Sequence, residues 1–298
     1  MKQVIHLSAD WTHPACNYLH DIEFARRSSS RVPSIPDYLS LKMQLLYPAH
    51  SPLFSAGHLP LVVFVNGGGY RSPKMYIRIP WLARLAERGY IVAMPQYRGS
   101  DIAAFPAMVQ DVRTAIRFLR SHADEFSIDP DRIVLMGGSA GGHAALLATY
   151  GDDRFDAPDD DLSISAAVCG VLDLYGPTDL LQMEPEGCSE LEAALSLSGR
   201  WFGGIDIRHH PESVAPSIVS RYIHAGVSIP PAFIAHGDAD EVVPYHQSKI
   251  LFHALNAAGH EAEFYCLDGA GHADPAFFTE SMMDLYADFI NRITNKKR

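Results

Sequence analysis

Short apolar runs recur along the chain from about residue 60 onward, separated by polar, glycine-rich or proline-rich stretches. Runs of this length that are bounded by turn residues are typical of buried β-strands. We expect strands over 61–66, 90–96, 132–138, 164–174, 231–237 and 261–267. Such continuous runs, unlike alternating ones, indicate strands that are covered on both faces.

Between these runs, apolar residues recur at helical spacing. The segment 106–121 carries Met108, Val112, Ala115, Ile116 and Leu119 on one face and Arg113, Arg117 and Arg120 on the other. This pattern predicts a surface helix packed on a sheet, and the segments 244–258 and 276–293 repeat it. Alternating strands and helices predict an α/β fold with a mostly parallel central sheet and helices on both of its faces.

One connection is too long for a plain crossover. More than fifty residues separate the strand that ends near 174 from the one that begins near 231. We therefore expect a small helical cap or lid insertion at about 175–229, over the carboxyl edge of the sheet, where open α/β proteins bind ligands. The lid belongs to a main domain over 41–298. We assign residues 1–40 to an N-terminal extension, for which a place in the cap stays open.

The balance of charged residues indicates which classes of binding partner are improbable. The chain has 24 Lys and Arg against 35 Asp and Glu, a formal net charge of −11, which disfavours nucleic acid and anionic membrane surfaces. No stretch approaches the ~18 apolar residues of a membrane span, and His6, Asp10 and His13 interrupt the amino end where a signal peptide would be apolar. We expect a cytoplasmic protein that acts on a small molecule. Its four cysteines form no C-x-x-C pair, so we expect reduced, mostly buried thiols.

A glycine-flanked serine is the strongest chemical signal. Gly137, Ser139 and Gly141 form a G-x-S-x-G pattern directly after a predicted strand and before a predicted helix. Small neighbours let strand and helix backbones approach closely, and the tight turn exposes the serine hydroxyl above the sheet. The next N–H, of Ala140, then lies at a helix amino end that favours an anion.

A serine nucleophile needs a histidine base held by a carboxylate. In this type of fold the acid and then the histidine follow the serine, in turns after late strands. His272 has that position, and two carboxylates compete for the acid. We favour Asp240, which stands past the strand end, and expect Asp238 to orient the turn.

The other histidines are expected to be structural or solvated. His143 lies one helical turn after the serine and is expected to be packed, while His236 is expected to fix the acidic turn. His209 and His210 have no carboxylate at metal spacing. We predict no metal and no cofactor.

Three consecutive glycines, 67 to 69, end the first predicted strand. They could cradle a phosphate, cradle a dinucleotide or present N–H groups to an oxyanion. The segment lacks the third glycine of G-x-G-x-x-G, and no G-K-[ST] closes a phosphate loop. The oxyanion interpretation is therefore favoured.

Together these motifs resemble α/β-hydrolases of the hormone-sensitive-lipase and feruloyl-esterase (BD-FAE-like) kind. The resemblance rests on VNGGGY, YRGS, FPAMVQDVRTAIRFLR, DPDRIVLMGGSAGGHAA, HGDADEVVPYHQS and GAGH, spread over about residues 60 to 275. It implies an α/β-hydrolase fold, an oxyanion hole formed by Gly68, Gly69 and Ala140, and Asp240 as the acid. One residue departs from the family pattern, because Asn66 stands where a histidine is usual. An asparagine donates and accepts hydrogen bonds, so we expect it to hold the loop without acid–base work.

The resemblance implies a serine carboxylesterase with the catalytic residues Ser139, Asp240 and His272. We expect small or aromatic acyl esters, of acetyl, short-chain acyl or feruloyl type. Five aromatic residues are candidates for the substrate pocket: Tyr70, Tyr97, Tyr175, Trp201 and Phe202. Amide cleavage, as in an arylformamidase or an acylaminoacyl-peptidase, and a non-catalytic ligand-binding role remain as alternatives. The resemblance also leaves a homodimer open.

Overall fold

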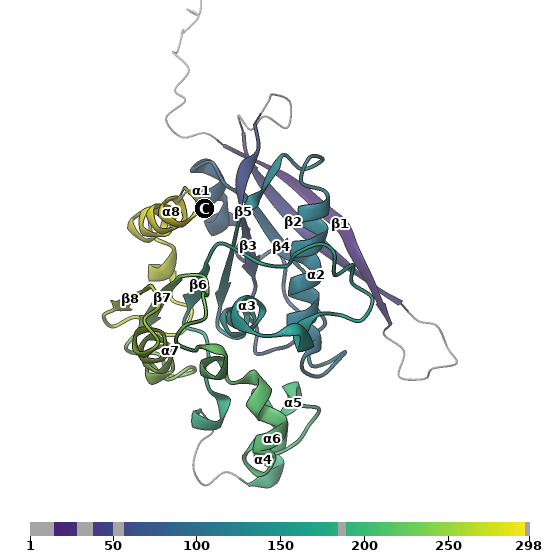
Figure 1. Ribbon diagram of the computed structural model, residues 1–298. Helices are drawn as coiled ribbons and strands as arrows, with labels where there is room; N and C mark the ends of the chain where they lie inside the picture. The colour runs from purple at the N-terminus through teal and green to yellow at the C-terminus, as the bar shows by residue number, and fades with distance from the viewer. Residues whose placement is uncertain (1–14, 29–37, 50–56, 184–188, 296–298) are drawn as a thin grey trace, which may run out of the picture.

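The computed structural model describes residues 15–28, 38–49, 57–183 and 189–295. They form an eight-stranded sheet in the order β1-β2-β4-β3-β5-β6-β7-β8 (Figure 1). The strands are β1 (Cys16–Ser28), β2 (Tyr38–Pro48), β3 (Leu59–Val65), β4 (Ile91–Pro95), β5 (Ile128–Gly138), β6 (Val171–Leu174), β7 (Ala232–Gly237) and β8 (Ala262–Leu267). β3 to β8 run parallel to one another, whereas β2 is antiparallel to both of its neighbours, β1 and β4. The predicted α/β fold with a mostly parallel sheet is confirmed.

Helices cover both faces of the sheet, as Figure 1 shows. The helices α2 (Ala107–Ser121), α3 (Ala140–Tyr150) and α7 (His246–Ala257) pack on one face, and α1 (Ile79–Glu87) and α8 (Glu280–Thr294) pack on the other. In β3, Val63 and Val65 face the first layer while Val62 and Phe64 face the second. A strand with two covered faces needs apolar residues at every position, which explains the continuous runs in the sequence.

The amino-terminal strand lies in the main sheet. Within the range expected as an N-terminal extension, residues 1–40, Cys16–Ser28 forms β1 and pairs with β2 at the edge of the sheet. Most side chains of β1 are exposed or half-buried. An edge strand of this kind carries no apolar run, so periodicity did not reveal it.

The strand expected at 164–174 is shorter in the structure, where β6 covers only Val171–Leu174. The carbonyl groups of Ser165 and Ala167 accept hydrogen bonds from the Arg120 side chain instead of from a neighbouring strand. The segment before β6 is therefore held as a loop against α2.

The arginine face of α2 is buried rather than exposed to solvent. Arg113 and Arg117 are each 8% exposed. Arg113 donates to the carbonyl groups of Ala148 and Gly151, and Arg117 donates to that of Ile164. The spacing predicted the two faces of the helix correctly, but a loop after α3 covers the second one, so that face does not meet solvent.

The segment expected to form the lid carries short helices: α4 (Glu190–Leu195), α5 (Leu197–Trp201) and α6 (Pro211–Val214). The indole of Trp201 stacks on Tyr70, whose ring lies 4.1 Å away. Since Tyr70 follows the end of β3 by only a few residues, α5 lies over the carboxyl edge of the sheet.

The cysteines differ from the expectation of mostly buried thiols. Cys266 is exposed, and Cys16 and Cys169 are half-buried. Cys188 lies outside the described residues. Among the helices that the structure describes, none is both long and apolar enough to cross a membrane.

A buried carboxyl lies beside the strand that leads to the serine turn. Asp173 on β6 pairs with Gly137 on β5 and is inaccessible to solvent. No ion-pair partner faces it among the described residues. Burial raises the pKa of Asp173 to about 8, so this side chain is largely protonated at neutral pH.

Asp173→Asn should flatten the pH dependence of stability. Between about pH 4, where an ordinary aspartate titrates, and about pH 8, the folded protein keeps a proton that the unfolded chain releases. The free energy of unfolding of the wild type therefore falls as pH rises through this window, and the variant lacks this contribution. Thermal unfolding of both proteins at several pH values checks this. If the melting temperatures of the wild type and of Asp173→Asn change equally with pH, the proposed contribution of Asp173 is contradicted.

Candidate active site

The serine lies on a tight turn between β5 and α3. Ser139 has φ 56° and ψ −130°, a conformation that residues other than glycine rarely adopt and that occurs at functional sites. A Cβ atom on Gly137 would lie 2.3 Å from the carbonyl oxygen of Gly141. Gly137 is therefore required by the close approach of β5 and α3, which is the reason given for the G-x-S-x-G spacing, whereas a Cβ atom on Gly141 would lie 2.1 Å from the carbonyl oxygen of Val65 on β3.

Three side chains from separate strands form one hydrogen-bonded chain. The Nε2 atom of His272 lies 2.9 Å from the Oγ atom of Ser139, and its Nδ1 atom lies 2.7 Å from Oδ2 of Asp240. Ser139 follows β5, Asp240 follows β7 and His272 follows β8. The structure thus brings together the three residues that the chain order predicts.

The carboxylate of Asp240 is saturated with donors. Its Oδ1 atom accepts the N–H groups of Val242 at 2.8 Å and Val243 at 2.9 Å, and Nε2 of His236 lies 3.2 Å from its Oδ2 atom. Burial favours the protonated form, but the hydrogen bonds from His236, His272 and the two amides outweigh it and hold the pKa of Asp240 well below its usual range. Asp240 is therefore held as an ionised carboxylate beside the Nδ1 atom of His272.

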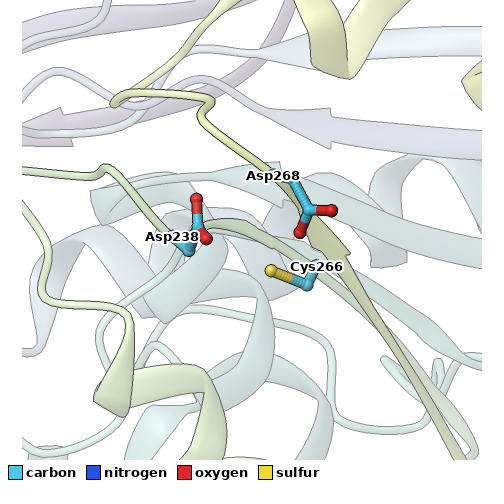
Figure 2. Close-up of side chains that lie close together, drawn as sticks. All are labelled: Asp238, Cys266 and Asp268. Atoms are coloured by element: carbon cyan, nitrogen blue, oxygen red, sulfur yellow. The ribbon is translucent and has the colours of Figure 1, made fainter.

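Asp238, the competing acid, has a different role. Its Oδ1 atom accepts the N–H of Gly269 at 2.7 Å and so joins the turn after β7 to the turn after β8, which agrees with the turn-orienting role expected of it. Figure 2 shows Asp238 beside Cys266 and Asp268. Within the described ranges this is the group close enough to share a metal ion. All three residues are exposed, and we assign the group no role.

The glycine run packs directly against the serine turn. A Cβ atom on Gly67 would lie 2.4 Å from the carbonyl oxygen of Gly138. Gly68 and Gly69 have φ values of 142° and 62°, which glycine adopts readily. Ala140 is the first residue of α3. No backbone acceptor is found, in the described part of the chain, for the N–H groups of Gly68, Gly69 and Ala140.

The loop is held through its main chain. The hydroxyl of Tyr97 donates to the carbonyl oxygen of Asn66 at 2.7 Å. The Asn66 side chain is 4% exposed, and its Nδ2 atom has no hydrogen-bond partner among the described residues. We expected the Asn66 side chain to hold the loop, but the structure assigns that contact to its backbone and to Tyr97.

A cavity of about 670 Å³ opens over Ser139 and His272. Tyr175 lines it and packs edge-on against the imidazole of His272, with ring centroids 5.0 Å apart. Leu197 of α5 closes another part of the wall. The segment after the glycines also contributes to the wall, and no sequence motif pointed to its five lining residues: Arg71, Ser72, Lys74, Ile77 and Arg78.

Four of the five aromatic residues expected in the pocket lie behind its walls. Tyr70 and Trp201 stack on each other, Tyr97 is buried beneath the glycine loop, and Phe202 packs against Trp201. None of the four lines the cavity described above. Their large apolar surfaces fill the space between α5 and the glycine loop, so Tyr175 is the one that faces the cavity.

His143 is a packed structural group, as expected. It is inaccessible to solvent, its Nδ1 atom accepts the Tyr70 hydroxyl at 2.8 Å, and its Nε2–H donates to the carbonyl oxygen of Ser217 at 2.7 Å. Burial lowers the pKa of His143 to about 4. A neutral imidazole therefore ties the glycine loop to the segment after α6.

Three proteins to which the chain is similar are named as esterases. The chain is 29% identical to Esterase LipQ of Mycobacterium tuberculosis over 91% of its own length and 65% of that protein. Its structure superposes on a truncated carbohydrate esterase from gut microbiota with a TM-score of 0.78, 26% identity and coverage of 96% and 99% of the two chains. Thermogutta terrifontis esterase 2, phosphorylated by paraoxon, gives a TM-score of 0.67 at 26% identity over 90% and 94% of the chains.

The chain spans 44% to 65% of the length of the first curated relatives that it matches. A model of the BD-FAE family matches residues 49–255. This range includes the glycine loop, the serine turn and the acidic turn. The chain belongs to the BD-FAE family of α/β-hydrolases.

Proposed function

We propose that the protein is a serine carboxylic-ester hydrolase that acts on small or aromatic acyl esters, of acetyl, short-chain acyl or feruloyl type. One observation carries the proposal: Ser139, His272 and Asp240 are joined by hydrogen bonds of 2.9 and 2.7 Å at the base of an open cavity. This is the arrangement that activates a serine hydroxyl for acyl transfer.

The reaction proceeds in two acyl transfers. Ser139 Oγ attacks the ester carbon while Nε2 of His272 takes its proton, and the ionised Asp240 stabilises the resulting imidazolium. The imidazolium returns the proton to the leaving alcohol, which leaves an acyl-enzyme. Water then attacks the acyl carbon, His272 takes its proton, and the acid departs as Ser139 is regenerated.

The developing oxyanion is stabilised by backbone donors. The N–H groups of Gly68, Gly69 and Ala140 have no other backbone acceptor in the described part of the chain, and the loop that carries two of them is fixed against the serine turn. Donors that are oriented before the reaction cost no reorganisation when charge develops, and one such donor is worth about 3 to 4 kcal/mol of barrier.

The relatives support the substrate class. One structural neighbour is named as a carbohydrate esterase, and another is an esterase that paraoxon phosphorylates. A cavity of about 670 Å³ has room for an aromatic acyl group or a short acyl chain, in the range of small-molecule sites.

A panel of p-nitrophenyl esters of rising chain length, with methyl ferulate and N-formylkynurenine, tests the proposed function. We expect the wild type to hydrolyse acetyl, short-chain or feruloyl esters and Ser139→Ala to lose the activity, and we expect paraoxon to place one diethylphosphoryl group on Ser139. Cleavage of N-formylkynurenine alone would favour amide chemistry. No cleavage of any compound, or full activity in Ser139→Ala, would overturn the proposal.

Asp240→Asn and Asp238→Asn form a matched pair that tests the acid. Asp240→Asn should lower kcat by about 10⁴-fold, because His272 loses the carboxylate that orients and stabilises it. Asp238→Asn keeps a side-chain oxygen for Gly269 N–H and should retain most of the activity. Steady-state kinetics with one ester suffice. Equal losses in the two variants would contradict the assignment of Asp240.

A further inference from the structure

Three basic residues lie in the wall of the cavity over Ser139. Arg71, Lys74 and Arg78 all belong to the segment that connects the glycine loop to α1, and all three line the cavity. No carboxylate lies within ion-pair distance of any of them, as far as the described ranges extend. The cavity wall thus carries three positively charged side chains, in a protein whose formal net charge is −11.

Arg78 is held in place by aromatic rings. Its guanidinium group lies 4.5 Å from the ring centroid of Trp81 and 4.9 Å from that of Phe278. Cation–π contacts of this kind orient a guanidinium without neutralising its charge. Its donors therefore remain available to a ligand in the cavity.

One carboxylate opposes the three cations in the cavity wall. Asp101 accepts the N–H and the hydroxyl of Ser72, at 2.9 and 2.8 Å. Burial raises the pKa of Asp101, but the Ser72 hydrogen bonds and nearby Arg71 outweigh it and lower the pKa, so Asp101 is ionised and offsets part of the Arg71 charge. The wall keeps an excess of positive charge, at Lys74 and Arg78 above all.

A second cavity extends the basic surface. It measures about 340 Å³, shares Arg71 and Asp101 with the first, and adds Arg200 of α5. A ligand that reaches from Ser139 past Arg71 would meet a further guanidinium there. The positive wall therefore continues beyond the immediate surroundings of the serine.

We infer that this site selects esters that carry an anionic oxygen group, such as a carboxylate, close to the scissile bond. The inference rests on the proposed ester hydrolysis and adds the charge of its substrate. Basic groups on the wall of a cavity raise the local concentration of anions and orient them, even where the protein as a whole is acidic. The anion lies on the acyl part or on the alcohol part of the ester, and two substrate pairs distinguish these.

Each pair compares a carboxylate with a carboxamide of the same shape. For the alcohol part the pair is 4-acetoxybenzoate and 4-acetoxybenzamide, and for the acyl part it is monomethyl terephthalate and methyl 4-carbamoylbenzoate. We expect kcat/KM for the carboxylate to exceed that for the carboxamide by about tenfold in at least one pair, since exposed ion pairs contribute a few-fold each. Salt at about 0.5 M should shrink the ratio by screening.

Charge-removing variants assign the effect to the wall. Lys74→Gln and Arg78→Gln should each lower the carboxylate-to-carboxamide ratio of kcat/KM by about threefold, and the double variant by about tenfold. Lys249→Gln is the matched control, because it removes one exposed positive charge on α7, outside the cavity lining. It should leave the ratio at the wild-type value. A ratio near one in the wild type, or equal ratios in all variants, overturns the inference.

Binding to Ser139→Ala separates this inference from the proposed function. Calorimetry should show monomethyl terephthalate or 4-acetoxybenzoate binding about tenfold more tightly than its carboxamide partner, and Lys74→Gln in the same background should remove the difference. If the wild type cleaves the ester bond of the carboxamide-bearing substrates, and the carboxylate changes neither rate nor binding, ester hydrolysis stands and the inference falls. If no ester is cleaved but the binding difference persists, the cationic site stands and the proposed function falls.

Discussion

The close contact between the ends of two neighbouring strands is the constraint on which the site depends. β3 and β5 are parallel neighbours, with Val65 beside Gly137, so their carboxyl ends meet at one edge of the sheet. At that edge a Cβ atom on Gly141 would lie 2.1 Å from the carbonyl oxygen of Val65, and one on Gly67 would lie 2.4 Å from that of Gly138. Only glycine fits at either position. The glycine loop and the serine turn are therefore brought together by backbone packing.

The other half of the site depends on the next two strands. β7 and β8 are also parallel neighbours, so the turns that carry Asp240 and His272 lie side by side. Buried His236 braces the first of these turns, since it contacts the Ser248 hydroxyl, the Val243 carbonyl and the Asp240 carboxylate. This bracing, with the two amides that bind Asp240, fixes the carboxylate before any substrate arrives. The sheet thus supplies Ser139 from one strand pair, and Asp240 and His272 from another.

The sequence predicted the features that depend on local pattern and chain order. Continuous apolar runs located the parallel strands, and the order of serine, aspartate and histidine identified three residues that the structure joins by hydrogen bonds. Features that depend on contacts between distant segments were not predictable in this way. The edge strand β1 has no apolar run, and the pairing of Tyr70 with Trp201 cannot be seen before the chain folds. The same holds for Arg78, because nothing in the local sequence shows that Phe278 will lie beside it.

Gly67→Ala tests the central claim most directly, because Gly67 lies outside the left-handed region of backbone conformation and the new methyl group acts only through its contact with the serine turn. The measurement is kcat and KM for one ester that the wild type cleaves, with thermal unfolding as the control for folding. If packing of the loop against the turn creates the oxyanion site, kcat falls by about a hundredfold while the variant remains folded. A folded variant with wild-type kcat would contradict the account.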